Sequence, residues 1–159
     1  MMLLALLACT VALPAQVAAS GDHDSAMKET ECPWLTVGTA ADVLGGDVTV
    51  TVAGNSNEGS CRFVRREATV DFLEIRVSAG SLHGCPSGSA PLRGVGNEAE
   101  RCRIADARGL SEEMASGSVR AVHFTVTISG RAARTSGKPS DSSDDALARI
   151  ADEVAGNLY

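Results

Sequence analysis

The chain has 159 residues, and its 20 Asp and Glu residues outnumber its 14 Lys and Arg residues, so its formal net charge is −6 at pH 7. This balance argues against nucleic acid as a partner, which needs a clustered basic footprint, and against simple adhesion to anionic lipid. Aromatic residues make up only 3% of the chain, so we expect a core of Val, Leu, Ile and Ala and few stacking sites for bases or sugars.

Residues 1–19 have the pattern of a cleaved secretory signal peptide. The apolar run at residues 1–13 is too short to span a bilayer, which needs about 20 residues, and Pro14 ends it. Small residues at positions 17–19 then precede Ser20, which we expect to begin the mature chain. The run lacks the usual Lys or Arg at its start, and a translational start further upstream would supply it.

A second interpretation of the same segment is a lipid anchor. The tetrapeptide Leu6-Leu7-Ala8-Cys9 resembles a bacterial lipobox, in which the cysteine is lipidated and becomes the new N-terminus. One acyl chain binds membranes only marginally, so such a lipoprotein needs its full multi-chain anchor. Secretion and anchoring at Cys9 both stay open, and both remove this cysteine from the folded domain.

The mature chain of about 140 residues has the length of one domain. Residues 20–31 are mostly polar or charged, and we expect a flexible leader there. The folded part is then a single extracytoplasmic domain over residues 32–159.

The four cysteines beyond the signal predict two disulfides, because an even cysteine set in a small exported domain usually forms a disulfide framework. Cys32, Cys61, Cys85 and Cys102 allow three connectivities, which the sequence leaves open. We expect the sequential pairing, Cys32 with Cys61 and Cys85 with Cys102, because it joins neighbouring elements. In the loop-entropy model these bridges stabilise the fold by roughly 3–4 and about 3 kcal/mol.

The domain is expected to begin with a short helix at residues 36–44. Thr39 and Asp42 have the spacing of a capping box, and Gly45-Gly46 is a strong stop signal. Alternation of apolar and polar residues then predicts strands. These strands lie at residues 47–52, from residue 61, and at 69–77, 98–104 and 119–129.

Two of these segments are irregular. In the third strand Val70 and Phe72 share one face while Leu73, Ile75 and Val77 share the other, which indicates a bulge near Phe72 or cover on both faces. Residues 110–115 have no clear period.

A long segment rich in Gly, Ser and Pro, residues 78–96, carries Cys85. Long ordered loops are often functional, so this loop is the expected contact surface. Near the C-terminus an amphipathic helix is predicted at residues 142–158, with its apolar residues in one stripe.

These elements predict an α+β fold, with an antiparallel sheet, a short N-terminal helix and a C-terminal amphipathic helix packed on one face. This order is compatible with the Mog1/PsbP-like arrangement.

The order of several short motifs resembles a known family. The motifs are Cys32-Pro33, Leu44-Gly45-Gly46, Cys61-Arg62-Phe63 and Gly94-Val95-Gly96-Asn97-Glu98-Ala99, followed by an Ala-rich C-terminal helix. In this order they resemble the small cell-envelope lipoproteins and secreted sensor-like domains of actinobacteria, over most of the mature chain. The resemblance implies an extracytoplasmic domain, and it carries over no catalytic residues.

A few side chains are candidates for partner contact. Arg62, Arg65 and Arg66 form the one basic cluster of an acidic chain, although such a cluster more often pairs with neighbouring carboxylates, here Glu67 and Asp71. Trp34, next to Cys32, is either packed on the disulfide or an exposed anchor for a partner. His83 lies close to Cys85.

No catalytic, metal or cofactor constellation is recognised. The Gly94–Ala99 motif lacks the preceding strand and following helix of a nucleotide loop, no nucleophile elbow is present, and oxidised cysteines do not ligate metals as thiolates. We therefore expect no cofactor and a non-catalytic binding or sensor-like module for an envelope ligand or protein. The alternatives are an accessory subunit that docks through its C-terminal helix and an envelope hydrolase that uses His123 or His83.

Overall fold

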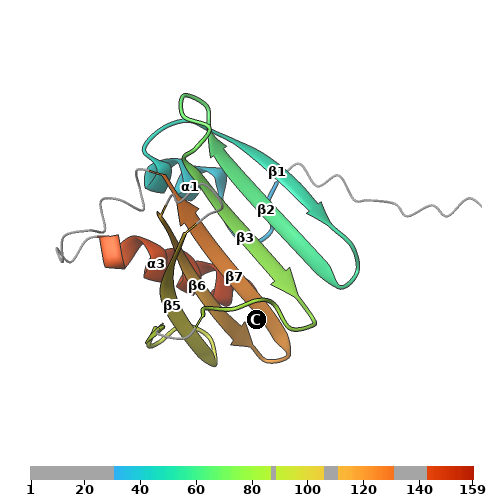
Figure 1. The fold of residues 1–159 in the computed structure, drawn as a ribbon. Helices are drawn as coiled ribbons and strands as arrows, with labels where there is room; N and C mark the ends of the chain where they lie inside the picture. Colours follow the sequence, from blue (N-terminus) through green and yellow to red (C-terminus); the bar gives the residue numbers. More distant parts are fainter. Residues whose placement is uncertain (1–30, 87–88, 106–110, 131–142) are drawn as a thin grey trace, which may run out of the picture.

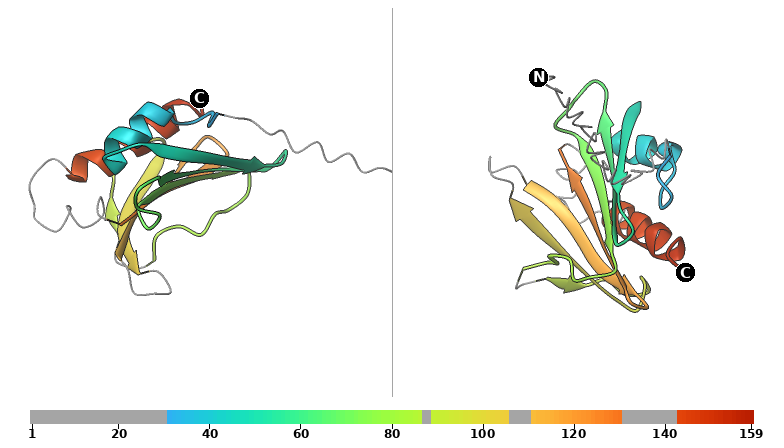
Figure 2. Two further views of the ribbon diagram at one scale, coloured as in Figure 1. Left: turned by 90° about the horizontal axis from the view of Figure 1, so that it is seen from above. Right: turned by 90° about the vertical axis from the view of Figure 1, so that its right-hand side faces the viewer.

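The structure is a computed structural model that describes residues 31–86, 89–105, 111–130 and 143–159. The expected signal peptide, Cys9 and residues 20–30 of the expected leader lie outside these residues. The described chain forms one antiparallel sheet with both of its helices on the same face (Figures 1 and 2). In chain order the elements are α1 (Val37–Leu44), β1 (Val48–Gly54), β2 (Glu58–Arg65), β3 (Phe72–Ser78), β4 (Ala90–Pro91), β5 (Glu98–Ala105), β6 (Ser111–Val119), β7 (Val122–Ser129) and α3 (Ser143–Gly156).

The order of the strands across the sheet is β1-β2-β3-β7-β6-β5-β4, and every pair is antiparallel. The last strand of the chain therefore lies in the middle, where it joins the β1–β3 meander to the β4–β6 group. This arrangement confirms the predicted α+β fold with a helix near each end of the domain. None of the described helices combines the length and the apolar character needed to cross a membrane.

The predicted sequential pairing of the cysteines is confirmed. Cys32 is bonded to Cys61 on β2, and Cys85 is bonded to Cys102 on β5. The first bond fixes the segment before α1 to the sheet, and the second fixes the segment after β3.

The short first helix starts and stops for local reasons. The Thr36 hydroxyl accepts a hydrogen bond from the Thr39 backbone N–H at 3.0 Å, so Thr36 is the N-cap. The predicted capping box at Thr39 and Asp42 is therefore wrong, because the helix begins one turn earlier. Gly45 ends the helix with a φ of 71°, a left-handed conformation that glycine adopts without strain.

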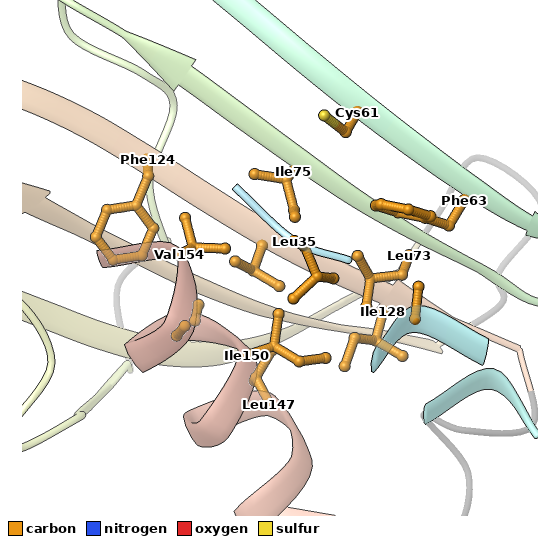
Figure 3. Packing of buried hydrophobic residues seen from close by; sticks show 14 of the residues in the cluster. Leu35, Cys61, Phe63, Leu73, Ile75, Phe124, Ile128, Leu147, Ile150 and Val154 are labelled. Atoms are coloured by element: carbon orange, nitrogen blue, oxygen red, sulfur yellow. The ribbon is translucent and has the colours of Figure 1, made fainter. Parts of the chain in front are cut away.

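The hydrophobic core lies between the two helices and the face of the sheet that they cover (Figure 3). On α3 the predicted apolar stripe is buried, and its residues Leu147, Ile150, Ala151, Val154 and Ala155 are at most 2% exposed. Alternate residues of the strands complete this core, among them Phe63, Ile75 and Val126, which are fully buried. As expected from the composition, most of the core is aliphatic.

The structure corrects the bounds of two predicted strands. The segment predicted as one strand at 119–129 contains a turn at Arg120, whose φ is 56°, so β6 ends at Val119 and β7 begins at Val122. Residues 111–115, which had no clear period, belong to β6.

The irregular third strand has a different explanation. The strand begins at Phe72 rather than at residue 69, and its register with β2 and β7 runs without a bulge. Phe72 points to the face without helices, where the Arg62 guanidinium lies 3.7 Å from its ring centroid. Cover on both faces is therefore the correct alternative.

Candidate binding site on the outer face of the sheet

The face of the sheet that points away from α1 and α3, here called the outer face, is polar but only partly open to solvent. Ser116 on β6 and Thr125 on β7 point to this face and are only 8% and 6% exposed. A segment that follows β3, residues 79–86, crosses the outer face toward β5 and is here called the strap (Figure 1).

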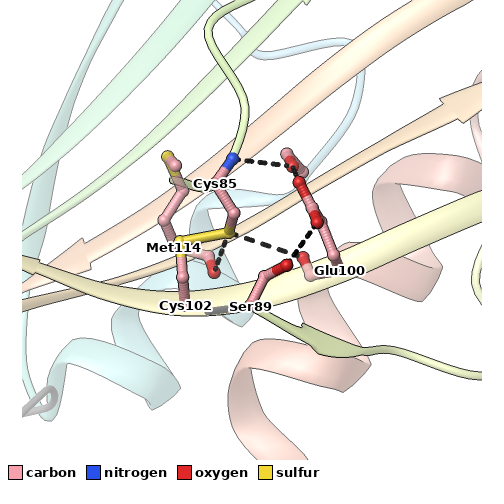
Figure 4. Close-up of a disulfide and its surroundings, with 6 residues drawn as sticks. Cys85, Ser89, Glu100, Cys102 and Met114 are labelled. Carbon is pink, nitrogen blue, oxygen red and sulfur yellow. Dashed lines mark hydrogen bonds between the residues drawn. A yellow bond between two sulfur atoms is a disulfide. The ribbon is translucent and has the colours of Figure 1, made fainter. Parts of the chain in front are cut away.

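The strap is held on the sheet by a covalent bond and a chain of hydrogen bonds (Figure 4). Beside the Cys85–Cys102 disulfide, the Cys85 backbone N–H donates to the Ser116 hydroxyl at 3.3 Å. The Ser116 hydroxyl donates to Glu100 Oε1 at 3.2 Å, and the Ser89 hydroxyl donates to Glu100 Oε2 at 2.5 Å. Both carboxylate oxygens of Glu100 thus have a hydroxyl donor, which fixes this side chain between the strap and β4.

The Cys85 sulfur also lies close to two backbone oxygens. Its Sγ is 3.7 Å from the Met114 carbonyl oxygen and 4.0 Å from the Glu100 carbonyl oxygen. An oxidised sulfur carries no hydrogen, so these are S···O contacts rather than hydrogen bonds. They show that the disulfide lies directly on the backbone of β5 and β6.

A hollow of about 550 Å³, here called the groove, opens between the strap and strands β4 to β7. Leu82 on the strap and Pro91 on β4 provide its apolar surface. Its polar lining residues are Ser89, Glu98, Glu100, Ser116, Ser118 and His123. The lining includes two carboxylates and no Lys or Arg, so the groove is acidic.

Three polar side chains lie in one row across the groove. Glu98 on β5 is opposite Ser118 on β6, and Ser118 is opposite His123 on β7. Directly opposite residues on antiparallel strands have Cβ atoms about 4.5–5.5 Å apart. A Ser-His-acid triad needs the imidazole between the hydroxyl and the carboxylate, whereas here the serine lies between the other two. This order favours ligand contact over triad chemistry.

Of the two histidines considered in the sequence, the structure places His123 in the groove. His83 is exposed on the strap, next to Gly84, and does not line the hollow. His123 is exposed on the polar outer face, where it lines the groove. No three His, Cys, Asp or Glu side chains gather in a metal-binding arrangement within the described ranges.

The three arginines of the basic cluster do not form one patch. Arg62 lies on the outer face, where it is ion-paired with Glu74 on the neighbouring strand. Arg65 points to the other face and contacts the fully buried Asp71 at 3.2 Å. The predicted pairing with Asp71 is thereby confirmed for Arg65.

Further contacts separate Arg65 and Arg66. Arg65 also lies 3.7 Å from Glu67, as predicted. The Arg66 side chain is exposed and has no ion pair within the described part of the chain. Arg66 is therefore the one arginine of this cluster that remains a candidate for partner contact.

Trp34 is half-buried on the helix face, far from the groove in the topology of the sheet. Its ring lies over Gly59, where an added Cβ would approach the ring to 2.4 Å. Gly59 is two residues along β2 from Cys61, on the same face. A second hollow of about 650 Å³ adjoins this ring, lined by Pro33, Val52 and Leu158 among others.

Sequence reasoning missed Glu98, Glu100, Ser116 and Ser118 as site residues. Nothing in their local pattern separates them from other polar residues of a solvated strand face. The useful signal was the expected Cys85–Cys102 bond, because it requires the strap to lie against β5.

The two disulfides are consistent with an oxidising, extracytoplasmic setting. No protein-family model, no curated protein and no solved structure matches this chain. The function is therefore argued from the geometry of the groove.

Proposed function

We propose that the protein is a non-catalytic binding or sensor-like module outside the cytoplasmic membrane, and that the groove is its contact surface. The observation that carries this proposal is the strap, which the Cys85–Cys102 bond and the hydrogen bond from the Cys85 N–H to Ser116 hold over the sheet. A site held in place before its ligand arrives loses little conformational freedom on binding.

The chemistry of the lining favours a ligand with a positively charged group. Glu98 is exposed in the groove and Glu100 lies at its wall, with no Lys or Arg among the lining residues. The net charge of −6 adds an attraction for cations at longer range. Hydroxyls of Ser118 and Ser89 and the His123 imidazole then provide directional hydrogen bonds. We propose an amine-bearing peptide or small molecule of the envelope as the ligand class.

The test is a titration of the disulfide-intact, ¹⁵N-labelled domain with tri-lysine, followed by backbone NMR shifts at low salt. We expect saturable shifts that are largest at Glu98, Ser118 and His123. The same peptide with its amines acetylated is expected to leave these signals unchanged. Shifts spread evenly over the acidic surface, or none in the groove, would contradict the proposal.

A matched pair of variants separates the groove from general charge. Glu98→Gln removes one negative charge from the groove, and Asp42→Asn removes one from exposed helix α1 on the other face. We expect Glu98→Gln to weaken tri-lysine binding at least about tenfold at low salt, as for loss of a charge-assisted contact. The Asp42→Asn variant should bind like the parent protein.

The two alternative functions have less support. The apolar stripe of α3 is buried within the domain, so docking through this helix would use only its polar residues, such as Arg149 and Asp152. A hydrolase that uses His123 or His83 lacks a carboxylate beyond the imidazole in the row that crosses the groove. Activity against envelope substrates that disappears in His123→Ala would favour the hydrolase instead.

The same proposal includes the cellular location of the protein and the detailed fold of its domain. The protein is secreted after cleavage before Ser20 or anchored through a lipid at Cys9, and the domain follows a Mog1/PsbP-like arrangement. The intact mass of the protein from the membrane fraction and from the medium distinguishes the first two. A soluble species that begins at Ser20 indicates secretion, and a membrane species with a lipid-modified Cys9 indicates the anchor.

A further inference from the structure

The two edges of the sheet are built very differently. At one edge β4 has only two residues, and one of them is Pro91, which has no backbone N–H to offer a new strand. At the other edge β1 has seven residues and pairs, within the described part of the chain, with β2 alone. Natural proteins usually shield an edge of this length with charges, prolines or bulges.

β1 has none of these shields. Its sequence from Val48 to Gly54 is Val-Thr-Val-Thr-Val-Ala-Gly, without a charged residue or a proline. Its register with β2 runs without interruption from the pair Val48–Arg65 to the pair Gly54–Gly59, so no bulge turns the edge away. In a chain with a net charge of −6, this edge is a neutral, regular strand.

The hydrogen bonds just beyond the two ends of β1 show in which direction its backbone groups point. The Asp47 carbonyl accepts from the Arg66 N–H at 2.9 Å, and the Asn55 N–H donates to the Glu58 carbonyl at 2.8 Å. Both residues therefore face β2. Since successive residues of an antiparallel strand alternate in direction, residues 49, 51 and 53 also face β2. Residues 48, 50, 52 and 54 then present their backbone N–H and C=O groups to the open edge.

We propose that β1 pairs antiparallel with β1 of a second copy of this chain, about a two-fold axis that passes between the two Thr51 residues. The outward residues are placed symmetrically about position 51, so residue 50 faces residue 52 of the other copy and residue 48 faces residue 54. Such a pairing is isologous and closed, as a two-fold interface must be. It joins two seven-stranded sheets into one continuous sheet.

The side chains of β1 suit this pairing on both faces. On the helix face Val50 and Val52, both half-buried, would meet Val52 and Val50 of the other copy. On the outer face Thr51 would meet Thr51, and cross-strand Thr–Thr pairs are favourable. The nearest outer-face charge is Arg62, opposite Thr51 on β2, and its ion pair with Glu74 reduces repulsion between the copies.

A second copy fits this edge better than an unrelated chain for reasons of charge and of adjoining surface. No like charges face each other across the axis, because residues 48–54 carry none. The second hollow, lined by Trp34 and Val52, begins beside the end of β1, where the start of the other β1 would lie. Apolar surface of each copy thus continues toward the other.

The first test is a cysteine at the axis. In the proposed register Thr51 and its counterpart form a non-hydrogen-bonded pair, whose Cα atoms lie about 4.5 Å apart, within the range of a disulfide. We expect Thr51→Cys to form a disulfide-linked dimer under mild oxidation, seen by intact mass without reductant. Thr49→Cys is the matched control, because residue 49 would face residue 53 and lie far from its own copy. Equal cross-linking of the two variants would overturn the proposal.

The second test uses charge at the same two positions. Both threonines are exposed, but position 51 lies opposite Arg62 of the same chain, so thermal unfolding at low concentration first checks that each arginine variant stays folded. We expect sedimentation velocity to show a reversible dimer for the parent protein and at least about tenfold weaker dimerisation for Thr51→Arg, because like charges directly opposite repel. Thr49→Arg, which faces Ala53, should dimerise nearly as the parent does.

A charge swap completes the design. An equimolar mixture of Thr51→Arg and Thr51→Glu is expected to dimerise where each variant alone does not. A parent protein that stays monomeric at every concentration tested would overturn the proposal, as would a variant series in which positions 49 and 51 behave alike. An added strand-forming peptide that binds β1 of a monomeric parent would assign the edge to another chain, and would likewise overturn self-pairing.

Discussion

The two faces of the sheet are formed by the same strands but carry different side chains. The helix face carries the aliphatic core, in which Phe63, Leu73 and Ile150 are fully buried. The outer face carries mostly polar side chains, and the strap covers part of it. Neighbouring residues on one strand therefore belong to different environments, because side chains alternate across a sheet.

One disulfide lies on the helix face and the other on the outer face. Cys61 is fully buried and belongs to the core cluster, so its bond to Cys32 is part of the packing. Cys85 and Cys102 are both half-buried, and their bond holds the strap over the groove. The comparison teaches that one bond of this protein is part of the core packing, while the other also shapes a surface.

The largest expected effect comes from two neighbours on β2 that lie on opposite faces. Phe63→Ala should lower the free energy of unfolding by about 4 kcal/mol, since it removes a fully buried ring and leaves a cavity. Val64→Ala, on the outer face and half-buried, should cost about 1 kcal/mol. Urea unfolding with intact disulfides measures both. Similar losses for the two variants would remove the distinction between the faces.

Deleting each disulfide separates the two roles. Replacing Cys32 and Cys61 by Ala should lower the free energy of unfolding by about 3.6 kcal/mol, from the loop-entropy model and a sequence separation of 29. The corresponding loss for Cys85 and Cys102, with a separation of 17, is about 3.1 kcal/mol.

Local measurements separate the two variants more clearly than these totals. Proteolysis should cut the strap in the variant without Cys85 and Cys102 while the core amides stay protected from exchange. In the variant without Cys32 and Cys61, core amides on β2 should lose protection. If the strap stays protected without its disulfide, the bond does not hold the strap in place.

The smallest expected effect concerns the hydrogen bonds beneath the strap. Ser116→Ala removes the acceptor for the Cys85 N–H and one donor to Glu100, so it should cost about 1 kcal/mol. Ser118→Ala, on the same strand and face, makes no such bond in the described chain and should change stability by less than about 0.5 kcal/mol. Thermal unfolding checks both. A larger effect at Ser118 would mean that contacts of Ser118 stabilise the groove more than the hydrogen bonds of Ser116 do.

Much of the fold could be predicted because local patterns and tertiary packing agree. The alternation of Val48, Val50 and Val52 marks a strand with one covered face, and the stripe on α3 marks the matching helix. The prediction was wrong where apolar and polar residues kept alternating through the turn between two strands. At Arg120 the alternation continues through a two-residue connection, so two strands were predicted as one.

The candidate site was much harder to predict than the fold. The long segment after β3 and its cysteine were singled out correctly as a surface feature, and the disulfide pairing was confirmed. The residues expected to contact a partner lie elsewhere, since Trp34 covers Gly59 and Arg65 is paired with Asp71. Site residues drawn from three strands share no sequence spacing, so no local pattern can gather them.

The sequence by itself determined the two helices, the alternating faces of the clearest strands, the presence of two disulfides and the acidic charge of this protein. These properties depend on neighbours along the chain or on simple counts, which a sequence states directly. Only the tertiary structure decided that β7 lies between β3 and β6, and that the strap crosses β6 at Ser116. Within the described residues it also left β1 at the edge of the sheet, paired with β2 alone. Such features arise from the order in which strands pair across the sheet, and contacts of that kind join residues far apart in sequence.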